Sequence, residues 1–216
     1  MVAGLGKPDA AKGMVDRAAA IPTNRGGVKA AAAMFFLQHG DPQRAASLAQ
    51  DAASAAEKLG PHAGRATTLQ NAARVLLATG QRAPALAVFQ KAVEAAGHSA
   101  WELQSMGIGI AQIALESNDR ELFVIALRAL TRARDLLPDA ATIRVDLAQV
   151  AYATGDTITA ATEMQRAAEL GPDNPTLAQQ CSDLLAELGR RDEAARWAAE
   201  AAKRQEDRKN KAAAPK

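Results

Sequence analysis

The chain has 216 residues and a formal net charge of +2 at neutral pH, so its charge gives no sign of a nucleic-acid-binding protein. Alanine accounts for 54 residues, and aromatic side chains make up only 3% of the chain. Because alanine favours helices and disfavours strands, this composition excludes an all-β protein. The single cysteine, Cys181, excludes a scaffold built on internal disulfides.

We predict that residues 1–25 form an N-terminal extension that carries one short helix. Two prolines bracket a run of helix formers over residues 8–20, and residues 21–27 have the composition of a linker. The segment lacks the apolar core of a signal peptide. The most apolar run, residues 30–37, is about eight residues long, far below the ~20 that a membrane-spanning helix needs. We therefore expect a cytoplasmic protein.

Four glycines are followed by the same spacing of alanines. The glycines are Gly40, Gly80, Gly155 and Gly189, and the alanines at offsets 5 and 12 are Ala45 and Ala52, Ala85 and Ala92, Ala160 and Ala167, and Ala194 and Ala201. A larger residue stands at offset 9 in two units, Phe89 and Met164. Each glycine ends one amphipathic segment and precedes the next, which is typical of a repeated helical hairpin.

This spacing resembles the tetratricopeptide repeat, a 34-residue helical hairpin with small residues at its eighth, twentieth and twenty-seventh positions and proline near its end. The matching residues of one unit are Ala148, Gly155, Ala160, Ala167 and Pro172. The predicted units are 26–65, 66–99, 100–140, 141–174 and 175–208. Unit 100–140 departs from the family, because its turn at residues 117–119 lacks glycine and the unit is about seven residues too long. We expect its helices to be extended.

The resemblance implies an all-α fold, a right-handed superhelical solenoid of about five hairpins over residues 26–208. One hairpin cannot bury its apolar face alone, so neighbouring hairpins must stack. In this family the first helix of each hairpin lines a concave groove. Residues 209–216 are rich in lysine and have little to bury, and we expect them to form a disordered basic tail.

The sequence offers no set of residues that would carry catalysis. The three histidines, His39, His62 and His98, fall in different predicted turns, whereas a zinc site needs three or four converging ligands. Residues 4–8 contain two glycines and a lysine but lack the spacing of a phosphate-binding loop. Cys181 falls at a core position of its repeat and is expected to be a buried, inert thiol. We expect no metal, no cofactor and no enzymatic activity.

The repeat frame of the family places a set of mostly polar side chains along the groove. These candidate partner-binding residues are Gln70, Arg74, Gln104, Gln112, Gln149, Tyr152, Gln179 and Asp183. Such a lining suits hydrogen bonding to a peptide backbone or to a partner helix, although polar residues are also ordinary on a solvated surface. One subfamily grips a terminal carboxylate with lysine and asparagine, and here Ala30 and Met34 stand at those positions, so that clamp is missing.

The resemblance therefore implies a non-enzymatic scaffold or adaptor that binds a peptide or helix of another protein in its concave groove. A homo-oligomer is a second option, because not all of the apolar residues 34–37 can point inward from one helix. The alternative function is a structural subunit of a larger assembly, with the basic C-terminal tail contacting nucleic acid or an acidic membrane surface. The near-neutral net charge disfavours both of those partners.

Overall fold

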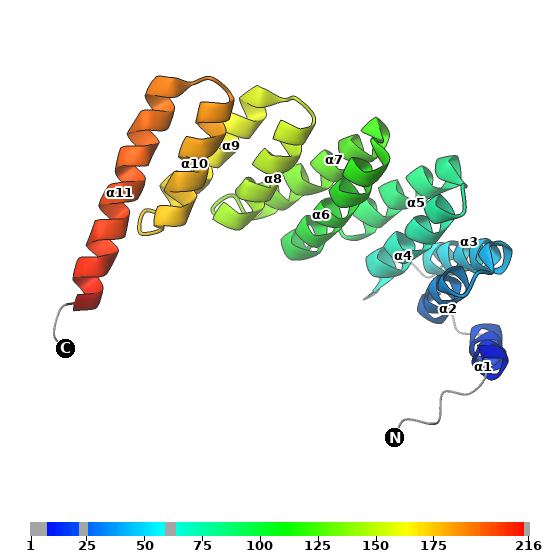
Figure 1. Ribbon diagram of the computed structural model, residues 1–216. Helices are drawn as coiled ribbons and strands as arrows, with labels where there is room; N and C mark the ends of the chain where they lie inside the picture. Colours follow the sequence, from blue (N-terminus) through cyan, green and yellow to red (C-terminus); the bar gives the residue numbers. More distant parts are fainter. Residues whose placement is uncertain (1–7, 22–25, 59–63, 214–216) are drawn as a thin grey trace. The chain divides into compact units, whose positions relative to one another are not determined.

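The computed structural model describes residues 8–21, 26–58 and 64–213, and these residues form helices joined by short turns, with no strand among them (Figure 1). The helices are α1 (Pro8–Ala20), α2 (Gly27–Gln38), α3 (Pro42–Lys58), α4 (Arg65–Ala78), α5 (Arg82–Ala95), α6 (Ala100–Ser117), α7 (Arg120–Leu136), α8 (Ala141–Ala153), α9 (Thr157–Leu170), α10 (Pro175–Glu187) and α11 (Arg191–Ala213). The all-α fold that the family resemblance implied is confirmed.

The helices fall into two compact units, residues 1–97 and residues 98–216. The first unit contains α1 and two hairpins, α2 with α3 and α4 with α5. The second unit contains three hairpins, α6 with α7, α8 with α9, and α10 with α11. The sequence predicted one repeat domain over residues 26–208, and the boundary between the units falls inside its unit 66–99.

All five hairpins turn in the same way. Each of the four repeat glycines has a positive φ between 75° and 81°, a conformation that glycine adopts without steric cost. The next residue donates its backbone N–H to the carbonyl five residues back, as Asp156 does to Ala151 at 2.9 Å. Unit 100–140 makes the same bond from Asp119 to Ala114 at 3.0 Å, with Asn118 at φ 52° in place of glycine. Asn118 therefore ends α6 in the way that glycine ends the first helix of the other hairpins.

Small residues hold the two helices of each hairpin close together. The alanines at offsets 5 and 12 from the turn glycines are all buried. Ala126 and Ala133, which are also seven residues apart but follow Asn118 by 8 and 15 residues, are buried as well. Phe89 and Met164, the larger residues at offset 9, are also buried. In α6, a Cβ on Gly107 would lie 2.7 Å from the Cγ of Leu130 on α7. The missing side chain of Gly107 thus permits α6 and α7 to pack closely.

The N-terminal helix has the predicted bounds, residues 8–20. It contacts α2, and the Arg44 guanidinium of α3 forms an ion pair with Asp16 at 2.9 Å. Residues 22–25 of the predicted linker and His62 lie outside the described residues. None of the helices in the described part of the chain is long and apolar enough to cross a membrane.

The prediction of a disordered basic tail is wrong for residues 209–213, because α11 continues to Ala213. Its last turns place Lys211 beside Asp173, with 3.3 Å between the ammonium nitrogen and a carboxylate oxygen. Lys209 lies 4.0 Å from Glu206 on the same helix. The prediction of disorder considered only the burial of apolar side chains, whereas these contacts are between charged side chains. Residues 214–216 lie outside the described part of the chain.

Candidate functional site

A cleft of about 260 Å³ opens between the first helices of two neighbouring hairpins, α6 and α8. Its lining residues are Ile108, Ala111, Gln112 and Leu115 of α6, Phe123 of α7, and Asp146, Gln149, Val150 and Ala153 of α8. Ala111, Phe123 and Val150 are buried, while Ile108 and Leu115 are exposed apolar residues. Two exposed amides, Gln112 and Gln149, stand at the cleft from opposite helices. An apolar cleft with a few convergent polar groups is the usual form of a binding site.

The exposed face of α6 carries a regular apolar stripe. Trp101, Ile108 and Leu115 are seven residues apart, so they lie on one side of the helix. Trp101 and Leu115 are 60% exposed and Ile108 is 42% exposed. The opposite side of α6 is also apolar and is buried in the hairpin, for example at Leu103 and Ile110. A helix that is apolar on two sides has one side available for a partner.

A side-chain hydrogen bond joins α6 to α8 beside the cleft. The Gln104 amide donates to the Asp146 carboxylate at 2.5 Å. Burial raises the pKa of Asp146, and the hydrogen bond from Gln104 acts in the opposite direction. The carboxylate is therefore held by a neutral donor and not by a cation.

A second polar link joins α8 to α10. The Tyr152 hydroxyl donates to the Glu187 carboxylate, and this bond raises the pKa of Tyr152. On α10 itself, the Gln179 amide donates to Asp183 at 2.7 Å. The first helices of the three hairpins of the second unit are thus connected in series, α6 to α8 and α8 to α10.

The second unit has further clefts. One of about 510 Å³ includes Arg120, Val124 and Thr154 and shares Phe123 and Ala153 with the cleft between α6 and α8. Another, of about 390 Å³, lies between α10 and α11, and most of its α11 lining is alanine. Of these three clefts, the one between α6 and α8 brings together two of the residues predicted for the groove.

The structure distributes the eight predicted groove residues over four places. Gln112 and Gln149 line the cleft between α6 and α8, and Gln104 and Tyr152 form the links beside it. Gln179 lines the cleft between α10 and α11, and Asp183 is its hydrogen-bond partner. Gln70 and Arg74 lie one helical turn apart on α4, which belongs to the first unit.

The apolar part of the cleft was missed by the sequence reasoning. Leu115 and Phe123 were not among the predicted site residues, although the seven-residue spacing of Trp101, Ile108 and Leu115 can be read from the sequence. Phe123 could not be found in this way, because it reaches the cleft from the second helix of the hairpin.

Cys181 is buried at the core of the last two hairpins, among Ala148, Met164 and Leu185. Burial raises the pKa of its thiol to about 12, so the thiol is protonated at neutral pH and is a poor nucleophile. Among the described residues, no three His, Cys, Asp or Glu side chains lie close enough together to hold a metal ion.

Residues 29–97, which take in nearly all of α2 and the whole of α3, α4 and α5, match the family model of the tetratricopeptide repeat. Residues 29–97 carry tetratricopeptide repeats. The turns and buried alanines of the second unit resemble those of the matched residues. No curated protein matches the sequence.

Solved structures show the same fold at low sequence identity. The tetratricopeptide-like repeats of a putative kinesin light chain from Podosopora anserina are 16% identical, with a TM-score of 0.53 over 84% of this chain and 95% of that one. YrrB, described as a tetratricopeptide repeat protein with an unusual peptide-binding site, is 17% identical, with a TM-score of 0.50 over 89% and 93%. A MamA protein is 20% identical, with a TM-score of 0.50 over 88% and 99%. These similarities concern the fold.

Proposed function

We propose that this chain is a non-enzymatic interaction scaffold that binds a segment of another protein in the cleft between α6 and α8. The observation that carries the proposal is the apolar cleft bordered by Gln112 and Gln149. Neither amide makes a side-chain hydrogen bond to another described residue, so each has a donor and an acceptor available. A bound peptide backbone or helix would use these groups, while its apolar side chains would cover Ile108 and Leu115.

The packing around the cleft supports a preformed site. Phe123 and Val150 form a buried floor, and the hydrogen bond between Gln104 and Asp146 fixes α6 relative to α8. A site whose walls are already ordered loses less conformational freedom when a partner binds. The short loops between these helices leave no segment that would have to move aside first.

The double variant Gln112→Ala/Gln149→Ala tests the proposal. Each lost hydrogen bond is worth about 0.5–1.5 kcal/mol, so we expect the affinity for the native partner to fall about tenfold. The partner would be captured from native cells with the wild-type chain, identified by mass spectrometry, and titrated against each variant. Circular dichroism would confirm that the variant keeps its helices.

The matched control is Gln43→Ala/Gln90→Ala, which makes the same chemical change at two exposed positions on α3 and α5. This control should bind like the wild type. Equal binding by wild type, variant and control would reject the cleft as the binding site. If binding were instead lost on truncation after Gln205, the basic end of α11 would be the contact, as in the alternative function. The truncation must retain Arg204, which is buried against α9.

A further inference from the structure

We propose that the segment bound in the cleft between α6 and α8 is basic and amphipathic, a helix that places aliphatic side chains in the cleft and lysine or arginine around it. This inference rests on the proposed function and adds the chemistry of the partner. It follows from the charges on α6, α8 and α10, which are mostly acidic, and from the neutral groups that hold three of their carboxylates.

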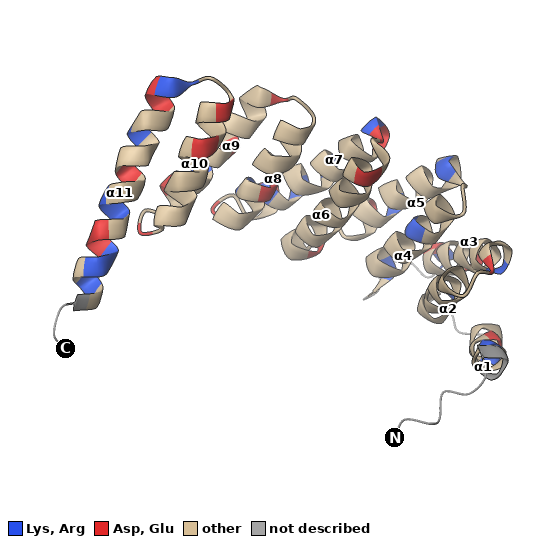
Figure 2. Ribbon diagram, in the orientation of Figure 1, with Lys and Arg blue, Asp and Glu red and all other residues tan. Residues whose placement is uncertain are grey.

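The first helices of the second unit are acidic. Neither α6 nor α10 contains lysine or arginine, while α6 carries Glu102 and Glu116 and α10 carries Asp183 and Glu187 (Figure 2). Helix α8 carries one residue of each sign, Asp146 and Arg144. Taken along the three helices, the acidic residues outnumber the basic ones five to one.

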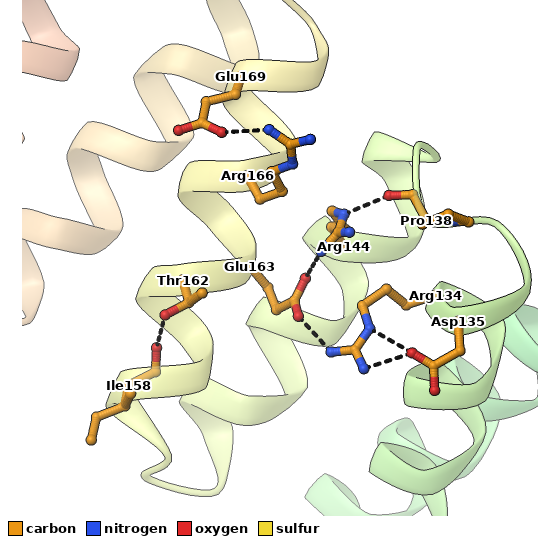
Figure 3. A network of polar contacts seen from close by, with 9 residues as sticks. All are labelled: Arg134, Asp135, Pro138, Arg144, Ile158, Thr162, Glu163, Arg166 and Glu169. Atoms are coloured by element: carbon orange, nitrogen blue, oxygen red, sulfur yellow. Dashed lines mark hydrogen bonds and ion pairs between the residues drawn. The ribbon is translucent and has the colours of Figure 1, made fainter.

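The one arginine of these helices does not neutralise the cleft. Arg144 points toward α9, where one of its terminal nitrogens bonds the Glu163 carboxylate, and its Nε donates to the Pro138 carbonyl at 2.9 Å (Figure 3). Its side chain is only 14% exposed. Among the described residues that line this cleft and the neighbouring one, Arg120 is the one cation, and it lies in the neighbouring cleft.

Three of the five carboxylates of the first helices are held by neutral groups. Asp146 accepts from the Gln104 amide, Asp183 from the Gln179 amide, and Glu187 from the Tyr152 hydroxyl. A hydrogen bond from a neutral donor satisfies an oxygen atom but leaves the negative charge in place. These helices therefore present uncompensated negative charge.

The second helices contrast with this pattern. Both carboxylates of α9 are ion-paired, Glu163 with Arg134 and Arg144, and Glu169 with Arg166 at 2.9 Å. The carboxylates of α9 are thus ion-paired, whereas the three first-helix carboxylates described above are not. Uncompensated charge beside an exposed apolar cleft favours a partner of the opposite charge and disfavours an acidic or phosphorylated one.

The test uses two synthetic helical peptides that share the same leucine positions and differ only in having lysine or glutamate at every polar position. Each peptide is labelled and titrated into the full chain at two salt concentrations, with fluorescence anisotropy as the readout. We expect the lysine peptide to bind, more weakly at high salt, and the glutamate peptide not to bind. Because the whole chain is positively charged at +2, non-specific attraction does not favour the lysine peptide.

The variant Asp146→Asn/Asp183→Asn/Glu187→Gln should bind the lysine peptide with an affinity about tenfold lower. The control Asp192→Asn/Glu206→Gln/Asp207→Asn makes the same change of charge on α11 and should leave its affinity unchanged. Equal weakening by both variants would overturn the proposal, because the attraction would then be non-specific.

Other outcomes separate this inference from the proposed function. If both peptides bound equally and Gln112→Ala/Gln149→Ala abolished binding, the cleft would remain the site and its preference for a basic partner would be overturned. If neither peptide bound, the inference would also fail, while capture of the native partner would still test the cleft. Self-association lost on truncation after Gln205 would identify the occupant as the basic end of α11 from a second copy, which contradicts a separate partner.

Discussion

Replacement of Glu163 by alanine should lower the free energy of unfolding of the second unit by about 3 kcal/mol. Glu163 is 5% exposed on α9, and its carboxylate binds Arg134 of α7 at 2.6 Å and Arg144 of α8 (Figure 3). Removing it would leave Arg144 without a carboxylate partner, while Arg134 would keep only its pair with the exposed Asp135. Breaking a buried ion pair on one side costs more than the pair itself contributes, because the remaining charge is left uncompensated.

Urea unfolding followed by tryptophan fluorescence measures this loss. The chain has two tryptophans, Trp101 on α6 and Trp197 on α11, and both lie in the second unit. Glu169→Ala is the matched control, because Glu169 is on the same helix and pairs with Arg166 at the surface. An exposed pair of this kind contributes about 0–1 kcal/mol. Equal losses in the two variants would contradict the role of Glu163 in joining two hairpins.

Replacement of Arg204 by alanine should cost about 2–3 kcal/mol and loosen α11. Arg204 is 8% exposed, although it lies in the most highly charged helix of the chain. One terminal nitrogen donates to the carbonyls of Ala168 and Gly171, both at 2.9 Å, where α9 ends. The guanidinium also lies 5.6 Å from the centre of the Trp197 ring. The variant would leave the last carbonyls of α9 without these donors and would remove a cation–π contact.

Hydrogen exchange is the sharpest measurement for this variant, because it reports each helix separately. We expect amides of α11 to lose protection while those of α6 and α7 keep it. Arg208→Ala, a change at an exposed position of the same helix, should have little effect. Arg204→Lys should be intermediate, since an ammonium cannot reproduce the planar set of donors. Unchanged protection of α11 in Arg204→Ala would show that its own helical propensity holds it in place.

The hairpins were predictable because their signal is local. A turn glycine with alanines at offsets 5 and 12 marks the closest approach of two helices, and each such alanine is buried as expected. Even the irregular turn kept its geometry, with Asn118 taking the left-handed conformation. The N-terminal helix over residues 8–20 was likewise marked by the prolines at its limits.

The contacts between hairpins were not predictable, because they join residues that are far apart in the sequence. Arg204 meets a carbonyl 36 residues earlier, and Glu163 meets arginines 19 and 29 residues earlier. No local pattern separates these side chains from solvated ones. For the same reason the sequence predicted only that the groove has mostly polar side chains. It could show which carboxylates lie on the first helices, but not that Asp146, Asp183 and Glu187 are held by neutral donors.

Site-specific photocrosslinking from the cleft tests the central claim most directly. A photoreactive phenylalanine would replace Gln112 at the cleft, and a second chain would carry it at Thr162, an exposed position on α9. After irradiation in native cells, the crosslinked peptides would be mapped by mass spectrometry. We expect position 112 to crosslink to one partner segment rich in lysine or arginine and position 162 to give no such product. Crosslinking from position 162 but not from position 112 would contradict the assignment of the cleft.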